Sequence, residues 1–262
     1  MKEILIRILK DVGRIQCESF RKNHSIEQKE SISSIVTEVD LLCDKFISEE
    51  IRREFLSHNI LTEESGLAFK GSEFTWVIDP LDGTSNFASG ISWFGILIAL
   101  FENSTPILAG AYLPIDDLLY FAESGRGAYL NGERLKIENV SLKNSLFGFA
   151  VDYSDDTEFL DYGINLYKVL IKKSRNIRCT NSLVDLMMVA DGRMGGTINL
   201  FTKIWDIAAP WLIIKESGGN MKDIYDKEIE FDLREKSILK NYPVITGSDS
   251  IISEIILAQK NQ

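Results

Sequence analysis

The stretch from Trp76 to Phe87, WVIDPLDGTSNF, places two carboxylates, Asp79 and Asp82, directly after a short apolar run. That run is typical of the end of a buried strand, and Pro80 followed by the pair Asp82-Gly83 predicts a turn away from the sheet. Two acids held so close repel each other unless a cation lies between them or one of them takes up a proton. The stretch therefore predicts a functional site at the end of a strand, where the two carboxylates lie.

The residue types at this turn favour a hard cation. Carboxylate oxygens suit Mg²⁺, Mn²⁺ or Ca²⁺ rather than zinc or copper. Behind the acids, Gly83 and Thr84 offer backbone N–H groups and a hydroxyl, which are suited to holding a phosphate. These features predict a metal-dependent phosphate site. The alternative is a tight turn whose aspartates only cap the next segment.

The run from Trp76 to Phe87 resembles, almost residue for residue, the signature of the inositol monophosphatase family, W-[IV]-I-D-P-[IL]-D-G-T-[ST]-N-F. This family belongs to the Mg²⁺-dependent, lithium-sensitive phosphatases. Upstream, residues 60–66 (ILTEESG) resemble the family's apolar strand that leads into a Glu-Glu-Ser turn. Downstream, residues 204–209 (IWDIAA) and 216–219 (ESGG) resemble its W-D-x-A-A and E-[AS]-G-G motifs. Three motifs in the family's order argue against coincidence.

Each outlying acid also has a plainer interpretation when it is taken alone. Glu63 is typical of a solvated loop acid, and Asp206 is typical of a residue that caps a helix over Asp206–Ser217. Pro210 fits such a helix, because a first-turn N–H has no helical partner to lose. The cap and ligand roles are compatible, since the start of a helix can aim a carboxylate into a site.

The resemblance implies how the acids would be shared among two or three Mg²⁺ ions. Glu63, Asp79 and the backbone carbonyl of Leu81 would hold one ion, and Asp79, Asp82 and Asp206 would hold a second. Such ions neutralise phosphate oxygens, lower the pKa of a bound water and stabilise the leaving oxygen.

The resemblance also implies the catalytic residues. Glu63 and Thr84 would orient and activate the attacking water. Asp40 lies in a T-x-x-D segment that begins at Thr37, and it would support Thr84 from outside the set of metal ligands. Taken alone, Asp40 is equally typical of an acid in the first turn of a helix, where acids are favoured.

The substrate-binding positions that the resemblance implies are Gly83, Thr84, Ser85, Asn199 and Asp206. Relatives that hydrolyse inositol phosphates usually carry an acid at the position of Asn199. Asn199 is neutral and presents a donor beside its acceptor. In addition, Pro210 replaces the glycine that follows W-D-x-A-A in the family. These departures leave the metal ligands intact and put inositol itself in doubt.

The periodicity of apolar residues predicts an α/β (α+β) chain, and the resemblance implies a layered αβαβα sandwich of the sugar phosphatase type. Helices are expected at Ile4–Ile15, Val39–Phe55, Glu158–Lys172, Leu183–Ala190, Asp206–Ser217 and from Ser248 onward. Strands are expected at Ile60–Thr62, Trp76–Ile78, Phe94–Phe101, Ile107–Leu113, Leu118–Glu123, in hairpin-like segments over Gly125–Leu135, at Leu146–Val151, near Ile177 and at Val244–Thr246. A change of pattern near residue 140 predicts an N-terminal lobe over 1–140, with the large sheet and most metal ligands. The α/β lobe over 141–262 would complete one structural unit.

Composition excludes several classes of protein. The chain of 262 residues is 45% hydrophobic, which is enough for a large core. Its net charge of −10 argues against binding to nucleic acid or to an acidic membrane through a basic face. The charges mixed through Met1 to Gln16 exclude a signal peptide, and no apolar run approaches membrane-spanning length. Cys17, Cys43 and Cys179 form neither a disulfide framework nor a zinc motif, which predicts a cytoplasmic protein.

Missing motifs narrow the catalytic repertoire to carboxylates and metal ions. His24 and His58 are the only histidines, stand outside any motif, and are expected at the surface or at helix ends. No G-x-S-x-G, Walker A or G-x-G-x-x-G run occurs. The resulting hypothesis is a Mg²⁺-dependent phosphomonoesterase that hydrolyses small polyol or sugar phosphates with a metal-activated water. The resemblance also implies a homodimer.

Two alternatives remain open at this point. One is the same chemistry on another phosphoester, such as fructose 1,6-bisphosphate, 3′-phosphoadenosine 5′-phosphate or histidinol phosphate. The other is a non-catalytic regulatory protein that keeps the fold but works through protein contacts, as some bacterial relatives act with the transcription machinery. The intact acids favour an enzyme, since a chain that had lost catalysis would be free to lose them.

Overall fold

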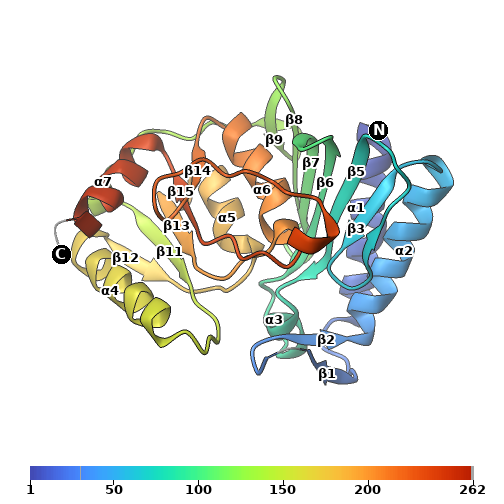
Figure 1. Ribbon diagram of the computed structural model, residues 1–262, viewed down its shortest axis with the longest axis horizontal. Helices are drawn as coiled ribbons and strands as arrows, with labels where there is room; N and C mark the ends of the chain where they lie inside the picture. The colour runs from blue at the N-terminus through green and yellow to red at the C-terminus, as the bar shows by residue number, and fades with distance from the viewer. Residues whose placement is uncertain (30, 261–262) are drawn as a thin grey trace.

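The computed structural model describes residues 1–29 and 31–260, which form five alternating layers of helices and sheets (Figure 1). The three helical layers are α1 (Lys2–Ser19) with α2 (Glu38–Glu54), then α5 (Leu183–Ala190) with α6 (Ile204–Glu216), then α4 (Thr157–Lys173) with α7 (Asp249–Lys260). A sheet lies between each pair of helical layers. This arrangement confirms the predicted αβαβα fold class.

The large sheet has the strand order β10-β9-β8-β7-β6-β5-β3-β4. Its strands are β3 (Asn59–Thr62), β4 (Gly66–Ala68), β5 (Phe74–Asp82), β6 (Gly95–Glu102), β7 (Thr105–Leu113), β8 (Leu118–Glu123), β9 (Gly127–Leu130) and β10 (Glu133–Arg134). One face packs on α1 and α2 through a core that contains Leu9, Ile47 and Trp76. The other face packs on α5 and α6 through a core that contains Leu97 and Ile213. Because successive side chains of a strand point to opposite faces, these strands supply both cores.

The second sheet has the strand order β12-β11-β13-β15-β14. Its strands are β11 (Leu146–Ala150), β12 (Asn176–Arg178), β13 (Gly196–Asn199), β14 (Asn220–Asp223) and β15 (Val244–Gly247). It packs on α4 and α7 through a third core that contains Phe147, Leu170 and Ile255. The remaining elements are the hairpin β1 (Ile26–Gln28) with β2 (Ile35–Thr37), the short helix α3 (Thr84–Ala88), and two 3₁₀ turns at Leu142–Asn144 and Glu235–Ser237. Helices α5 and α6 thus lie between the two sheets, and α6 carries Asp206.

Most predicted elements are confirmed within a few residues, and two expectations are wrong. Strand β5 continues to Asp82, so Asp79 and Asp82 lie in the strand and not in a turn after it. Helix α6 begins at Ile204, so Pro210 lies inside the helix and not in its first turn. Since proline has no N–H, the carbonyl of Asp206 lacks the helical hydrogen bond that residue 210 would otherwise donate.

Several short elements were not predicted. They are β1, β2, β4, β13, β14 and α3, each of which has at most five residues. The two large sheets use residues 59–134 and 146–247, and the division of the chain into lobes at residue 140 stays a prediction. No helix within the described ranges is both long enough and apolar enough to cross a membrane.

Candidate active site

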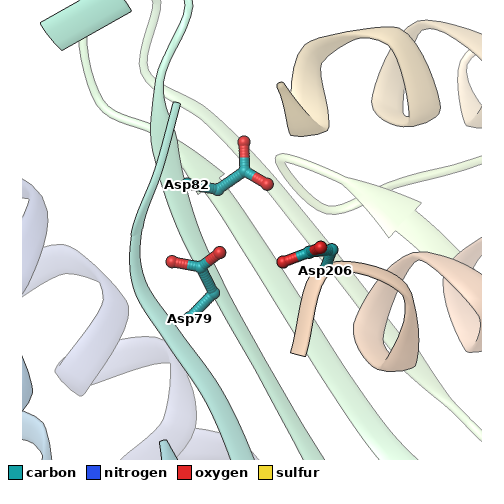
Figure 2. A group of neighbouring side chains, drawn as sticks. All are labelled: Asp79, Asp82 and Asp206. Atoms are coloured by element: carbon teal, nitrogen blue, oxygen red, sulfur yellow. The ribbon is translucent and has the colours of Figure 1, made fainter. Parts of the chain in front are cut away.

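A β-bulge at the end of β5 turns two acids toward the same region. Asp79 pairs with Leu97 of β6 and Asp82 pairs with Gly95, so β5 contains one extra residue between the two pairs. In a regular strand, residues three positions apart point to opposite faces. The extra residue removes this constraint, and both carboxylates project to one side of the strand (Figure 2).

The bulge is held from the first helix. Pro80 lies within it and has no N–H to give to the sheet. The carbonyl of Pro80 accepts a 2.9 Å hydrogen bond from Nε2 of Gln16, which is fully buried in α1. A polar side chain from the first layer therefore fixes the strand where its pairing is interrupted.

Three carboxylates from β5 and α6 converge on one position. Asp79, Asp82 and Asp206 each offer an oxygen that lies within 4.8 Å of the other two (Figure 2). One oxygen of each aspartate accepts a backbone hydrogen bond. The three donors are Leu81 N at 3.0 Å from Asp79, Leu183 N at 2.6 Å from Asp82, and Lys203 N at 2.6 Å from Asp206. These bonds fix the orientation of each carboxylate and leave its second oxygen available.

The three aspartates resist ionisation together. Burial raises the pKa of Asp79 and Asp206 well above the usual range, and the negative charges of neighbouring acids raise it further. Burial also raises the pKa of Asp82, to about 7, although the hydrogen bond from Leu183 N opposes the shift. Such a cluster is stable only with bound protons or a cation, and a hard cation fits its all-oxygen donors.

Glu63 lies at the margin of this cluster and contacts a lysine. Lys29, just after β1, donates from Nζ to Glu63 Oε1 at 2.8 Å and to Glu64 Oε1 at 2.6 Å. The charge of Glu63 still reaches the aspartates, because it is the largest cause after burial of the raised pKa of Asp79. Burial raises the pKa of Glu64 to about 7. Glu63 is thus next to the aspartate group but outside the set whose oxygens converge.

Thr84 is oriented by groups that only accept hydrogen bonds. Its hydroxyl lies 2.7 Å from Asp40 Oδ1 and 3.0 Å from the carbonyl oxygen of Leu81. Asp40 is the third residue of α2 and also accepts a hydrogen bond from the N–H of Thr37, the residue that caps the start of that helix. Asp40 therefore caps the helix and accepts a hydrogen bond from Thr84 at once, and its role in catalysis stays a prediction.

Gly83 occupies a position that no other residue fits well. Its φ of +84° lies in the left-handed region, and an added Cβ would lie 2.5 Å from the carbonyl oxygen of Trp93. It directly precedes α3, in which Ser85 is exposed. Asn86 then donates from Nδ2 to the carbonyl oxygens of Trp93 and Thr180, each at 2.9 Å. The turn after β5 is thereby tied to the segment that leads into α5.

Comparison with known proteins identifies the family. Residues 1–257 match the inositol monophosphatase family. The chain belongs to this family. It is 36% identical over 213 residues to the fructose-1,6-bisphosphatase/inositol-1-monophosphatase of Aquifex aeolicus, with 79% of both proteins covered. It is 34% identical over 229 residues to Nus factor SuhB of Pasteurella multocida, with 85% of both covered. The solved structure of the Thermotoga maritima IMPase superposes with a TM-score of 0.87 at 29% identity and covers 99% of this chain and 96% of that one.

Membership of the inositol monophosphatase family makes this protein a phosphatase, that is, a phosphoric monoester hydrolase. The relatives carry different names, which leaves the exact substrate open. The family resemblance inferred from the three motifs is confirmed. The roles assigned to individual residues through that resemblance stay predictions.

Asn199, the residue expected to contact the leaving group of the substrate, is buried and hydrogen-bonded within the protein. Asn199 ends β13 and is only 5% exposed. Its amide oxygen accepts a 3.1 Å hydrogen bond from the hydroxyl of Thr197, which lies on the same face of the strand. One of the two lone pairs of the Asn199 amide oxygen is therefore already used within the protein.

Sequence reasoning missed several groups around the site of this family member. Gln16, Lys29 and the N–H of Leu183 each contact a site segment from a distant part of the chain. Only Gln16 carried a signal in the sequence, as a polar residue that extends the apolar stripe of the first helix.

His58 follows α2, where it stacks against Phe55 and accepts a hydrogen bond from the indole of Trp76. All three cysteines are free.

Proposed function

We propose that this protein is a Mg²⁺-dependent phosphomonoesterase of small polyol or sugar phosphates. The observation that carries the proposal is the convergence of Asp79, Asp82 and Asp206, each with one oxygen fixed by a backbone N–H. Fixed carboxylates provide oxygen ligands for cations, and the bound cations would in turn attract a phosphate. Family membership supports phosphate ester hydrolysis as the reaction.

The donor set fits Mg²⁺. Glu63, Asp79 and the carbonyl of Leu81 would hold one ion, and Asp79, Asp82 and Asp206 a second, with two or three ions in all. The Leu81 carbonyl lies beside the Thr84 hydroxyl, and all these donors are hard oxygens. Bound Mg²⁺ would supply neutralisation of the phosphate oxygens and of the developing charge on the leaving oxygen.

Thr84 and Glu63 would place the attacking water. The Thr84 hydroxyl has carboxylate and carbonyl acceptors on two sides, so its proton is directed to them and its lone pairs remain for a water molecule. The water would donate one hydrogen to Thr84 Oγ1 and the other to the carboxylate of Glu63. Lys29 Nζ lies 2.8 Å from Glu63 Oε1, and the carboxylate has further acceptor sites for a hydrogen of the water. The N–H groups of Gly83, Thr84 and Ser85 would hold the phosphate oxygens.

The leaving group would lie on the side of Asn199 and Asp206. The names of relatives give a range of substrates, which includes fructose 1,6-bisphosphate and inositol 1-phosphate. We also propose a homodimer in the cytoplasm that binds no nucleic acid and no membrane. The regulatory alternative has support in the name of the Pasteurella multocida relative, which is a Nus factor.

Phosphate release from a panel of phosphoesters, with Mg²⁺ and with EDTA, tests the proposal. The panel contains myo-inositol 1-phosphate, glycerol 2-phosphate, fructose 1,6-bisphosphate, 3′-phosphoadenosine 5′-phosphate, histidinol phosphate and phenyl phosphate. We expect Mg²⁺-dependent release from at least one polyol or sugar phosphate. Activity that survives exhaustive EDTA treatment, or activity on none of these polyols and sugars, would overturn it.

A further inference from the structure

An acid that the family motifs do not include lies beside Asn199. Strands β11 and β13 are parallel, and Ala150 at the end of β11 is the register partner of Asn199 at the end of β13. Asp152 follows Ala150 by two residues. It therefore lies just beyond the ends of β11 and β13, at the edge of the sheet where Asn199 is the last strand residue. Carboxyl ends of neighbouring parallel strands are a common place for groups that bind ligands.

Asn181 fixes the position of Asp152. The side-chain amide of Asn181 donates from Nδ2 to the carbonyl oxygen of Val151 at 2.9 Å and to Asp152 Oδ1 at 3.1 Å. Asn181 adopts a φ of +49°, a left-handed conformation that asparagine tolerates better than most residues. Among the described residues, Asp152 Oδ2 has no hydrogen-bond partner. One oxygen of Asp152 is thus held in place while the other stays available.

The same short turn connects Asp152 to the aspartate cluster. Asn181 is followed by Ser182 and then by Leu183, whose N–H donates to Asp82 Oδ1 at 2.6 Å. The two acids are close enough that the charge of Asp152 contributes to the raised pKa of Asp82, after burial and the effect of Glu63 and Asp185. Burial also raises the pKa of Asp152 itself. Asp152, held by Asn181 two residues before Leu183, therefore lies near the cluster on the side of the second sheet.

Asp152 offers what Asn199 lacks. The amide oxygen of Asn199 carries no charge and already accepts one hydrogen bond from Thr197. A carboxylate oxygen accepts a hydroxyl hydrogen in a charge-assisted bond, which is stronger than a neutral one. A neutral polyol satisfies such an oxygen, whereas a second phosphate group would be repelled by it.

We propose that Asp152 determines specificity by accepting a hydrogen bond from a hydroxyl of the leaving group, and that it favours neutral polyols over leaving groups with a second phosphate. The proposal rests on the proposed function, because it assigns a partner to the alcohol side of that reaction. In relatives, the acid that contacts the substrate is expected at the position of Asn199, at the end of β13. In this protein, the proposal assigns that contact to Asp152, in the loop after β11.

The test compares Asp152→Asn with Asp155→Asn, a matched change at an exposed acid of the same loop that accepts a hydrogen bond from Tyr153. The substrates are myo-inositol 1-phosphate, fructose 1,6-bisphosphate and phenyl phosphate, whose leaving group has no further hydroxyl. For Asp152→Asn we expect kcat/KM on inositol 1-phosphate to fall by roughly tenfold or more, which is the effect of one charge-assisted hydrogen bond. On phenyl phosphate we expect a change of less than about threefold, and the preference for the bisphosphate should rise. Asp155→Asn should leave kcat/KM unchanged on all three substrates.

Further variants separate recognition from a structural effect. Asp152→Glu keeps an acidic oxygen and should recover part of the lost selectivity. A deoxy analogue of inositol 1-phosphate that lacks the recognised hydroxyl cannot make this hydrogen bond. On that analogue, Asp152→Asn should lower kcat/KM little further, because the hydrogen bond is already absent. Thermal unfolding shows whether each variant folds. If Asp152→Asn does not fold, kcat/KM of Asp152→Glu and kcat/KM of the wild-type protein on the deoxy analogue provide the test.

Three results would overturn the inference. An equal loss on inositol 1-phosphate and phenyl phosphate would show that Asp152 acts on Asp82 or on the fold and not on the alcohol. Unchanged selectivity in a folded Asp152→Asn protein would place specificity elsewhere while leaving the proposed function intact. Wild-type protein that cleaves phenyl phosphate but no polyol or sugar phosphate would refute both the proposed function and this inference.

Discussion

The hydroxyl of Thr84 lies 2.7 Å from Asp40 Oδ1, which joins the first turn of α2 to the segment that follows β5. The other oxygen of Asp40 accepts the backbone N–H of Thr37 at 2.9 Å. The start of a helix and a residue of the candidate site therefore share one carboxylate. The direction of the Thr84 proton depends on that carboxylate, because Thr84 has a single proton and Asp40 is its closest acceptor.

Asp40→Asn should separate these two functions of Asp40. An amide presents one acceptor instead of two and can itself donate to Thr84 Oγ1, which would occupy the lone pair intended for water. We expect kcat to fall by about 10–100-fold with a small change in KM, as is typical when a group behind the site is altered. Steady-state kinetics provide the measurement. Glu38→Gln, an exposed acid of the same first turn, is the control and should keep normal kcat.

The aspartate cluster predicts how the stability of the metal-free protein depends on pH. The pKa of Asp82 rises to about 7 on folding, and those of Asp79 and Asp206 also rise, so the folded state holds these protons more tightly than the unfolded chain. This stabilisation is complete below the unfolded pKa of about 4 and is lost as the pH rises through about 7. The Tm in EDTA should therefore fall between pH 5.5 and pH 8.

Mg²⁺ should remove that loss. A cation stabilises the ionised carboxylates, so the rise of Tm on adding Mg²⁺ should be larger at pH 8 than at pH 5.5 by about 4 °C or more, which corresponds to roughly 1–2 kcal/mol for a chain of this size. Thermal unfolding by circular dichroism at both pH values measures it. An equal Mg²⁺ effect at the two pH values would contradict the assignment of this cluster as the metal site.

Asp79→Asn should abolish turnover while it leaves the fold intact. Asp79 is buried beside both other aspartates and is the carboxylate assigned to two ions, and an amide cannot replace a shared charge. We expect kcat to fall by roughly three orders of magnitude, which corresponds to several kcal/mol of lost charge stabilisation. The metal-free variant should have an equal or higher Tm at pH 8, since one repulsive charge is gone.

The comparison for this variant is Glu102→Gln, at the exposed end of β6. That change should affect neither kcat nor the Mg²⁺ dependence of Tm. Near-normal kcat in the folded Asp79→Asn protein would show that the assignment of two ions to this residue is wrong.

Gly83→Ala should destabilise the protein more than the same change at another left-handed glycine. Gly83 and Gly71 have φ values of +84° and +76°, but an added Cβ meets the Trp93 carbonyl oxygen at 2.5 Å only at Gly83. Strain of the backbone alone costs about 1–2 kcal/mol and applies to both. The collision at Gly83 should add a further 1–3 kcal/mol or so, because rigid backbone must move.

Urea denaturation of the two alanine variants measures this difference in the free energy of unfolding. The turn after β5 also places Thr84, so Gly83→Ala should lower kcat, whereas Gly71→Ala should not. Equal destabilisation by the two changes would mean that the turn can relax away from Trp93.

The sequence by itself determined the elements whose pattern is local. Strand β8 and helix α5 have the predicted bounds, because alternation and 3.6-residue periodicity are properties of adjacent residues. The motif from Trp76 to Phe87 likewise indicated the acids, the glycine and the family. Short strands such as β13 and β14 carry too few residues to show a period, and they exist because β15 lies between them and pairs with both.

The tertiary structure decided how the acids meet. Asp79 and Asp82 face the same side because pairing with β6 creates a bulge, which local turn signals misrepresented as a break in the strand. Asp82 takes its orientation from the N–H of Leu183, 101 residues away along the chain. Gln16 from α1 and Lys29 from the segment after β1 contact the site in the same way. Such contacts depend on the packing of whole elements, because the sequence of one segment does not show which distant segment will lie against it.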